Sequence, residues 1–553
     1  MERGSKVAQQ ADYVIIGGGS AGCVLAGRLS EDPNHSVCLL EAGGGGDGLI
    51  VNVPAAAVVM LSKPLNNWKL ETVPQSGLTG RRGFQPRGKC LGGSSAINAM
   101  IYIRGHRWDY DHWAAQGNEG WSYDDVLPYF CLSEKNERFH DQYHGNNGPM
   151  PVSDIRTDSP FHDYFLNAAR ECDIPILEDF NGAEQEGAGV FQVTQANGER
   201  YSTARAYLFP HLIQRSNLRV ETKALVQRII FHNKRAVAVE YKQGNELHRI
   251  SANKEIILSA GAFQSPQLLM LSGIGDQQEL TQHGIPVVHH LPGVGKNLQD
   301  HPDFIFGYTT PSFDTFGFSP GGIVRAIKAI KQFRQQRRGL WTSNFAEAGA
   351  FLKTHPNLEA PDIQLHMVTA LVDDHGRQLH FNQGYSCHVC VLRPESRGTV
   401  TLASGNPNDT PLIDPAFLED ERDLDVLVEG YKITERIMKA PAMARWIAKD
   451  MFTAEIKTDD DIRRIIRQRA DTVYHPVGTC KMGVDDMAVV DPQLCVKGVS
   501  GLRVVDASIM PTLIGGNTNA PVIMIAEKAV DMIVGRSRVA SQEEQPSLAE
   551  LAQ

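Results

Sequence analysis

The stretch that decides the fold lies near the front of the chain and reads Asp12-Tyr13-Val14-Ile15-Ile16-Gly17-Gly18-Gly19-Ser20-Ala21-Gly22. Its first five residues form a short apolar, β-branched run, which predicts a buried parallel strand. Val24, Leu25 and Leu29 continue at helical spacing, and 36–40 reads as a second strand that ends at Glu41. The order strand, glycine turn, helix, strand is typical of a dinucleotide-binding unit.

The glycines at the GxGxxG positions each have a physical role. Gly17 permits the tight turn, Gly19 lets a pyrophosphate approach the backbone, and Gly22 lets helix and strand pack closely. Phosphate groups would then lie at the positive end of the helix dipole, beside Ser20 and Ala21.

The acidic residue at the tip of the second strand indicates which nucleotide is bound. Glu41, followed by Ala42, is placed to accept hydrogen bonds from ribose hydroxyls, and its charge would repel a 2′-phosphate. An unphosphorylated adenosine is therefore expected, and this pattern alone leaves FAD and NAD as alternatives.

Three further stretches resemble the glucose–methanol–choline (GMC) family of FAD-dependent oxidoreductases. They are 86–100 (PRGKCLGGSSAINAM), 261–275 (GAFQSPQLLMLSGIG), and the C-terminal pair 475–480 (HPVGTC) and 515–521 (GGNTNAP). Their order and spacing fit the family from about residue 12 to about residue 535. Within it, the sequence looks most similar to bacterial choline and alkanol dehydrogenases.

The resemblance implies which residues contact FAD. Beyond the glycine turn and Glu41, they are Arg87, Leu91, Gly93, Asn98, Ala99, Met100, Val226, Asp506, Ala507, Asn517 and Pro521. Some family members bind the flavin covalently through a histidine in the 86–100 loop. Ile97 stands at that place and has no nucleophile, so non-covalent FAD is expected.

Oxidation of an alcohol by hydride transfer needs a base for the hydroxyl proton, and histidine suits this with a pKa of ~6.5. The resemblance places His475 beside the flavin N5, and it gives Asn519 the second catalytic position, with its amide on the substrate oxygen. Asn519 precedes a proline at a helix start, so a plain helix cap is the alternative. The histidines expected to be structural include His289, His290, His301, His366 and His388.

The predicted reaction is oxidation of an aliphatic or aromatic primary alcohol to the aldehyde, with choline as an alternative substrate. A dehydrogenase is favoured by analogy, with oxidase activity left open and oxygen, a quinone or a dye as acceptor. A non-redox lyase that keeps FAD, and an NAD enzyme on the same N-terminal unit, are the competing hypotheses. The residues expected near the substrate are Trp68, Trp341, Asn344 and Glu347.

The chain has 553 residues, and one core rarely exceeds ~250–300 residues, so several domains are expected. The predicted fold is α/β with an α+β substrate part: a Rossmann-like FAD-binding domain interleaved with a substrate domain on an antiparallel sheet. The FAD-binding domain is expected at 12–155, 218–305 and 465–538, and the substrate domain at 156–217 and 306–464.

The net charge of −10 argues against a nucleic-acid partner. No run approaches the ~18–20 apolar residues of a membrane span, and 1–11 lacks a signal-peptide core, so a cytoplasmic enzyme is expected. The basic amphipathic stretch 323–340 permits peripheral contact at the inner membrane, with a solvated helix as the alternative. No metal site is expected, because Cys387 and Cys390 would point to opposite faces of a strand. The polar 536–553 segment is expected to be frayed or disordered.

Overall fold

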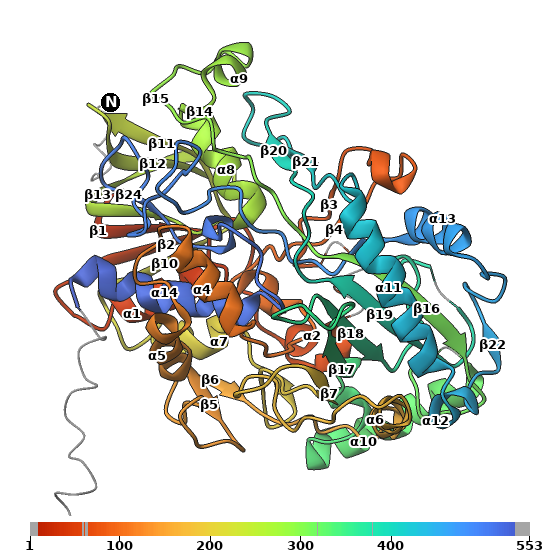
Figure 1. The fold of residues 1–553 in the computed structure, drawn as a ribbon. Coiled ribbons are helices and arrows are strands. Elements are labelled where there is room, and N and C mark those ends of the chain that lie inside the picture. The colour runs from red at the N-terminus through yellow and green to blue at the C-terminus, as the bar shows by residue number, and fades with distance from the viewer. Residues whose placement is uncertain are drawn as a thin grey trace, which may run out of the picture.

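Two seven-stranded sheets dominate the computed structural model (Figure 1), which describes residues 9–57, 60, 63, 65–317, 319–378 and 380–536. Nearly all of the polar C-terminal stretch, 537–553, lies outside the described residues. Each sheet has its own hydrophobic core cluster, which confirms the predicted combination of α/β and α+β parts.

The first sheet contains the predicted dinucleotide-binding unit. Its strand order is β10 (Leu218–Thr222), β2 (Val37–Glu41), β1 (Gln9–Ile16), β13 (Glu246–Leu258), β12 (Arg235–Gln243) and β11 (Ala224–His232), with β24 (Leu502–Val504) beside β13. β10, β2, β1, β13 and β24 are parallel, and β12 and β11 are antiparallel additions. The carboxyl ends of the parallel strands therefore share one edge, where ligands of such sheets bind.

Helices from both ends of the chain cover this sheet. α1 (Ser20–Leu29) packs on α14 (Asn519–Val534), which also contacts α5 (Tyr123–Ser133). Arg28 of α1 pairs with the buried Glu527 of α14 at 2.8 Å, and Tyr207 donates to the same carboxylate. Figure 1 shows α1 and α14 side by side although they lie at opposite ends of the colour scale.

The second sheet is antiparallel, as predicted for the substrate part. Its order is β22 (Lys449–Asp450), β16 (Pro302–Thr309), β19 (Gly384–Val391), β18 (Ile363–Val368), β17 (Ala346–Leu352) and β7 (Gly187–Val190), with β23 (Asp471–Thr472) beside β16. α6 (Phe161–Glu171) and α11 (Glu421–Met438) pack on it, with α12 (Pro441–Ala444) and α13 (Asp459–Arg469) alongside. β16 crosses the expected boundary at 305, and β23 lies after the expected boundary at 465, yet both strands belong to this sheet. We therefore propose the same division, with the first boundary moved to before β16 and the second to after β23.

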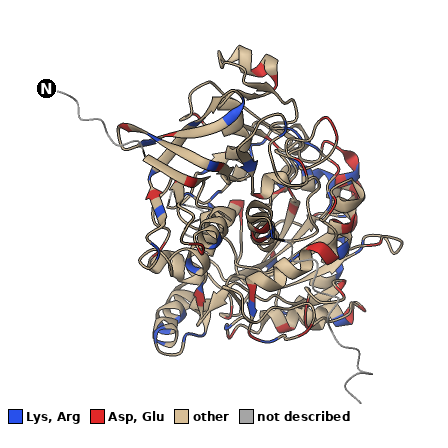
Figure 2. Cartoon of the chain, turned by 90° about the vertical axis from the view of Figure 1, so that its left-hand side faces the viewer, with Lys and Arg blue, Asp and Glu red and all other residues tan. Residues whose placement is uncertain are grey.

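The remaining elements connect the sheets or lie at their edges. They are α2 (Leu49–Asn52), β3 (Leu70–Glu71), β4 (Phe84–Gln85), α4 (Arg107–Ala115), β5 (Glu134–Asn136), β6 (Met150–Val152), β8 (Gln195–Ala196), β9 (Glu199–Arg200), α7 (Thr203–Tyr207), α8 (Gly261–Leu271), β14 (Ile274–Gly275), α9 (Gln277–Gln282), β15 (His289–His290), α10 (Pro320–Gln336), β20 (Thr399–Thr401) and β21 (Leu412–Asp414). α8 begins at Gly261, so Pro266 lies inside the helix. Figure 2 shows Lys and Arg interspersed with Asp and Glu.

Candidate active site

A cavity of about 1130 Å³ is lined by residues of both sheets and their loops. Predicted residues on its wall are Gly17, Gly19, Ser20, Ala21, Glu41, Ala42, Arg87, Gly93, Asn98, Ala99, Met100, Val226, Asp506, Ala507, Asn517, His475 and Asn519. Three of the residues predicted to contact FAD are absent from the wall: Gly22, Leu91 and Pro521. Gly22 packs on the turn, while Leu91 and Pro521 are buried.

The glycine turn has the geometry that a phosphate-binding turn requires. Gly17 has φ +100°, a backbone conformation that other residues rarely adopt. A Cβ on Gly22 would lie 1.9 Å from the Gly17 carbonyl oxygen, so only glycine lets α1 start so close to β1. The turn therefore presents the N-terminus of α1 to the cavity, which suits an anionic group.

Two buried carboxylates shape the same end of the cavity. Glu41 accepts from the backbone N–H groups of Gly18 (2.8 Å) and Gly43 (2.7 Å). Burial raises the pKa of this carboxyl, although both hydrogen bonds oppose the shift. Asp506 accepts from the Gly261 N–H at the start of α8 (2.9 Å) and from the Ser265 hydroxyl (2.6 Å). Both side chains are fixed before any ribose or ribityl hydroxyl arrives.

His475 is held on a constrained backbone. Tyr474 has φ +73°, a strained conformation for a bulky residue. Arg87 donates to the Tyr474 carbonyl at 2.6 Å, and the Asp300 carboxylate accepts from the His475 backbone N–H at 2.8 Å. The Tyr474 hydroxyl lies 2.6 Å from Nδ1 of His375. These contacts fix the imidazole at the cavity wall without using its ring nitrogens.

The ring contacts of His475 determine which nitrogen carries the proton. His301 Nε2 lies 3.0 Å from the Leu392 carbonyl, which only accepts, so this nitrogen donates. Burial lowers the pKa of His301 to about 3, so its ring is neutral and its Nδ1 must accept. That Nδ1 lies 3.0 Å from Nδ1 of His475, which therefore donates. The lone pair of His475 is left on Nε2.

The partner of that lone pair is Asn517, two residues before the predicted Asn519. The Asn517 amide nitrogen lies 3.3 Å from His475 Nε2, and its oxygen accepts from Gln364 at 3.1 Å. The oxygen of Asn519 accepts from the Ser20 hydroxyl at 2.7 Å, at the dinucleotide turn. Thr518 occupies the N-cap of α14, so Asn519 is its first helical residue and not its cap. The contacts therefore support Asn517 as the partner of His475.

Burial also lowers the pKa of His475 well below its usual value, and repulsion from His301, His366 and Arg87 adds to the shift. The imidazole is therefore neutral at neutral pH. A neutral imidazole with an unprotonated Nε2 on the cavity wall is already in the form that a general base requires.

Three histidines expected to be structural belong to this site. His301 sets the tautomer of His475, and His388 lines the cavity with Asp303 behind it. His366 lines the cavity with both ring nitrogens buried and without a hydrogen-bond partner among the described residues. His366 interrupts the apolar strand β18 (IQLHMV), which is the sequence signal that could have found it. Trp68, Trp341 and Asn344 line the cavity as predicted, whereas Glu347 does not and instead accepts from Ser343 at 2.6 Å.

The cavity has the features expected of a binding site for a dinucleotide with a reactive ring. The turn supplies an anion site, Glu41 supplies hydroxyl acceptors, and the pair His475–Asn517 lies farther along the wall. Among the residues that the structure describes, no group of His, Cys, Asp and Glu is arranged to hold a metal ion. Fold and cavity thus indicate a dinucleotide-binding protein with a buried, neutral histidine on the wall of its cavity.

Comparison with known proteins then specifies the family. Models of the GMC oxidoreductase family match residues 11–303 and 394–526. The chain is 46% identical to the alcohol dehydrogenase [acceptor] of Pseudomonas putida, covering 96% of this chain and 97% of the relative. It is 44% identical to mitochondrial choline dehydrogenase of Homo sapiens, covering 96% and 91%. A solved formate oxidase structure from Aspergillus oryzae, from work on FAD modification, matches with TM-score 0.87 and 26% identity, covering 95% and 98%. The chain belongs to the GMC oxidoreductase family, and its cofactor is FAD.

Proposed function

We propose that the protein is an FAD-dependent dehydrogenase that oxidises primary alcohols to aldehydes. The observation that carries this proposal is the neighbouring pair of His475 Nε2, a lone-pair acceptor, and the Asn517 amide nitrogen, a donor, at 3.3 Å. A substrate hydroxyl that lies beside this pair can reach both atoms, because its proton can pass to the imidazole while its oxygen accepts from the amide.

FAD supplies the hydride acceptor when it is bound. This chain supplies the proton acceptor, the donor to the oxygen and the apolar walls that exclude water. His301 keeps the accepting lone pair on the cavity side of His475, and Gln364 keeps the amino group of Asn517 on the same side.

Non-covalent binding of the flavin is part of this proposal. Ile97, which lines the cavity, offers no nucleophile at the position where some relatives carry a histidine. Precipitation of the protein with acid should therefore release the flavin into the supernatant. Flavin retained in the pellet would contradict non-covalent binding.

The substrate that the walls favour is uncharged. Near His475 the wall carries Ile101, Phe316, Phe345, Val368 and Val473. The carboxylate of Asp303 lies behind His388, to which it is bonded at 2.7 Å, and it is not on the wall itself. A cationic substrate would therefore meet imidazoles and hydrocarbon, which favours an alkanol over choline.

Anaerobic mixing tests the reaction. The purified protein should be yellow, and a primary alcohol should bleach the flavin absorbance without oxygen. Bound flavin that no alcohol bleaches would support a non-redox lyase instead, and a colourless protein would contradict the FAD assignment.

Choline and 3,3-dimethylbutan-1-ol form a matched pair with the same shape, and the uncharged compound should reduce the flavin faster. The reverse order would favour the choline alternative. Mixing the reduced enzyme with oxygen, a quinone or a dye would identify the acceptor.

Peripheral contact with an anionic membrane is a second proposal, carried by α10. Ile323, Val324, Ile327 and Ile330 are 43–62% exposed, and three of them also line the cavity. The cations without an ion pair among the described residues are Lys328, Lys331, Arg334 and Arg338. No helix in the described ranges is long and apolar enough to cross a membrane.

Sedimentation with vesicles tests this contact. The wild type should pellet with phosphatidylcholine vesicles that contain phosphatidylglycerol, and less with phosphatidylcholine alone. Lys328→Glu combined with Lys331→Glu should abolish the difference. Equal sedimentation of wild type and variant would remove the proposal and leave α10 as a solvated helix.

A further inference from the structure

Arg200 is a fully buried cation for which the described residues provide no anion. Its Nε donates to the Val51 carbonyl at 3.0 Å, and its Nη1 donates to the Ser95 carbonyl at 3.2 Å and to Oδ1 of Asn98 at 2.9 Å. Among the described residues, its Nη2 has no hydrogen-bond partner. All three acceptors are neutral, and no ion pair to a described carboxylate includes Arg200.

The surroundings of Arg200 do not remove its charge. Burial lowers the pKa of the guanidinium to about 9, which leaves it protonated at neutral pH. Burial also raises the pKa of the neighbouring Cys90 thiol to about 12, so this thiol is neutral. An uncompensated buried charge costs several kcal/mol, so an anion is expected to complete the site.

The contacts of Arg200 point to the cavity. Oδ1 of Asn98 accepts both from Arg200 and from the Met100 backbone N–H at 3.0 Å. With its oxygen engaged twice, the amide nitrogen of Asn98 is left for the cavity, which Asn98 lines. The next residue, Ala99, accepts from Asn344, which also lines the cavity. This wall segment therefore lies at the junction with the substrate domain, beyond the phosphate-binding turn.

We propose that Arg200 is a positioning residue for the flavin ring: it orients the Asn98 amide toward the ring, and its charge stabilises the ring in its anionic reduced form. This inference rests on the proposed function, because it assumes FAD in the cavity. Its role differs from that of His475, since Arg200 acts on the cofactor and does not touch the substrate.

The experiment compares holoenzymes that carry Arg200→Met, Arg200→Gln or Arg200→Lys, with Arg107→Met as the control. Arg107 is an exposed arginine that pairs with Asp124 and does not line the cavity. The readouts are the flavin content, the dissociation constant of the flavin–sulfite adduct and the two-electron midpoint potential. Sulfite adds a negative charge to the flavin, so its affinity reports a nearby cation.

The neutral variants should weaken sulfite binding on the order of tenfold, and the same tenfold change corresponds to a potential lower by ~30 mV. Arg200→Lys should remain close to wild type, and Arg107→Met should not change either value. Neutral variants with wild-type sulfite affinity and potential would overturn the proposal. The proposal would also be overturned if the variants lose part of their FAD while the remaining bound flavin keeps the wild-type potential. The charge of Arg200 would then stabilise the diphosphate of FAD and not the flavin ring.

If neither neutral variant binds flavin, the Arg200→Lys variant distinguishes a role of charge from a role in packing. A lysine variant that binds flavin at the wild-type midpoint potential would support the role of charge. A lysine variant without flavin would show that Arg200 acts only through packing, and it would overturn the proposal. Failure of the proposed function would appear separately, as wild-type flavin that alcohols do not bleach.

Discussion

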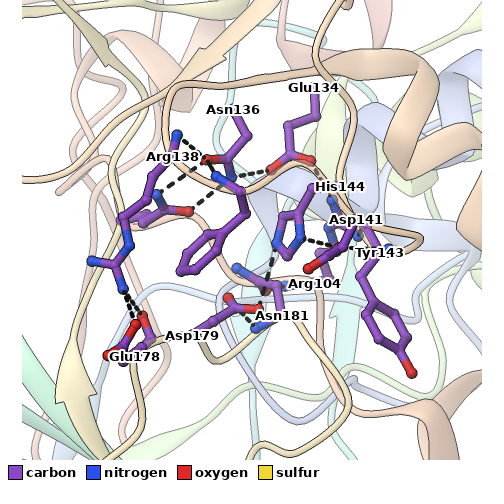
Figure 3. Close-up of polar contacts among 12 residues, drawn as sticks. Arg104, Glu134, Asn136, Arg138, Asp141, Tyr143, His144, Glu178, Asp179 and Asn181 are labelled. Atoms are coloured by element: carbon purple, nitrogen blue, oxygen red, sulfur yellow. Dashed lines mark hydrogen bonds and ion pairs between the residues drawn. The ribbon is translucent and has the colours of Figure 1, made fainter.

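Arg104 and Arg200 are both fully buried arginines, yet their surroundings differ. Arg104 pairs with Glu134 at 2.6 Å, and Glu134 also accepts from Asn136 and from the Gly145 N–H. Figure 3 shows this pair within a larger polar network that includes His144 between Asp141 and Asp179. Arg200 has only neutral acceptors.

The difference separates a structural network from an incomplete site. Burial acts to lower the pKa of Arg104, but Tyr102 and Glu134 outweigh it and the pKa rises. The pKa of Arg200 falls, because no carboxylate offsets burial. The ring nitrogens of His366 also have no hydrogen-bond partner among the described residues, and His366 lines the cavity. Arg200 and His366 are thus two buried groups with unsatisfied nitrogens, one beside the cavity and one on its wall.

The largest expected effect comes from breaking the buried Arg104–Glu134 ion pair. Glu134→Gln leaves Arg104 buried without its anion, which should cost about 3–5 kcal/mol of unfolding free energy. Urea unfolding followed by tryptophan fluorescence measures the loss. Asp124→Asn is the matched control, since the Arg107–Asp124 pair is 54% and 76% exposed and should contribute at most ~1 kcal/mol. Equal losses in the two variants would refute the view that Arg104 depends on Glu134.

His475→Ala tests the region around the cavity. Removal of the general base should slow anaerobic flavin reduction by ~10²–10⁴-fold, with the flavin spectrum retained. Stopped-flow absorbance measures the rate, and the exposed His232→Ala serves as the control. A rate near that of the wild type would exclude His475 as the base.

Asn517→Ala and Asn519→Ala distinguish two residues that lie on the same turn of chain. Loss of the Asn517 donor should slow reduction by ~10²-fold. Asn519→Ala should have a smaller effect on this rate and should instead weaken FAD retention, because its partner is Ser20. A larger rate loss in Asn519→Ala would restore the sequence-based assignment.

Asn517 and Asn519 also show which features of the site local sequence pattern does not predict. The strand, turn and helix over 9–29 follow from local pattern, because their apolar spacing and glycines specify them. The choice between Asn517 and Asn519 depends on Gln364 and Ser20, which lie 153 and 499 residues away in sequence. His301 reaches His475 across 174 residues. Such contacts are set by the packing of the two domains, which local pattern does not contain.

The smallest expected effect concerns pH. A histidine base with an ordinary pKa of ~6.5 would lose about three quarters of its neutral form at pH 6.0. Since the pKa of His475 lies well below that value, the neutral base persists and the rate of flavin reduction should be the same at pH 6.0 and pH 8.0.

Burial raises the pKa of Asp300 to about 6, and its carboxylate accepts from the backbone N–H groups of His475 and His301. Asp300→Asn therefore separates the two groups: a fall in rate near pH 6 that disappears in this variant belongs to Asp300. A fall near pH 6.5 that persists would contradict the lowered pKa of His475.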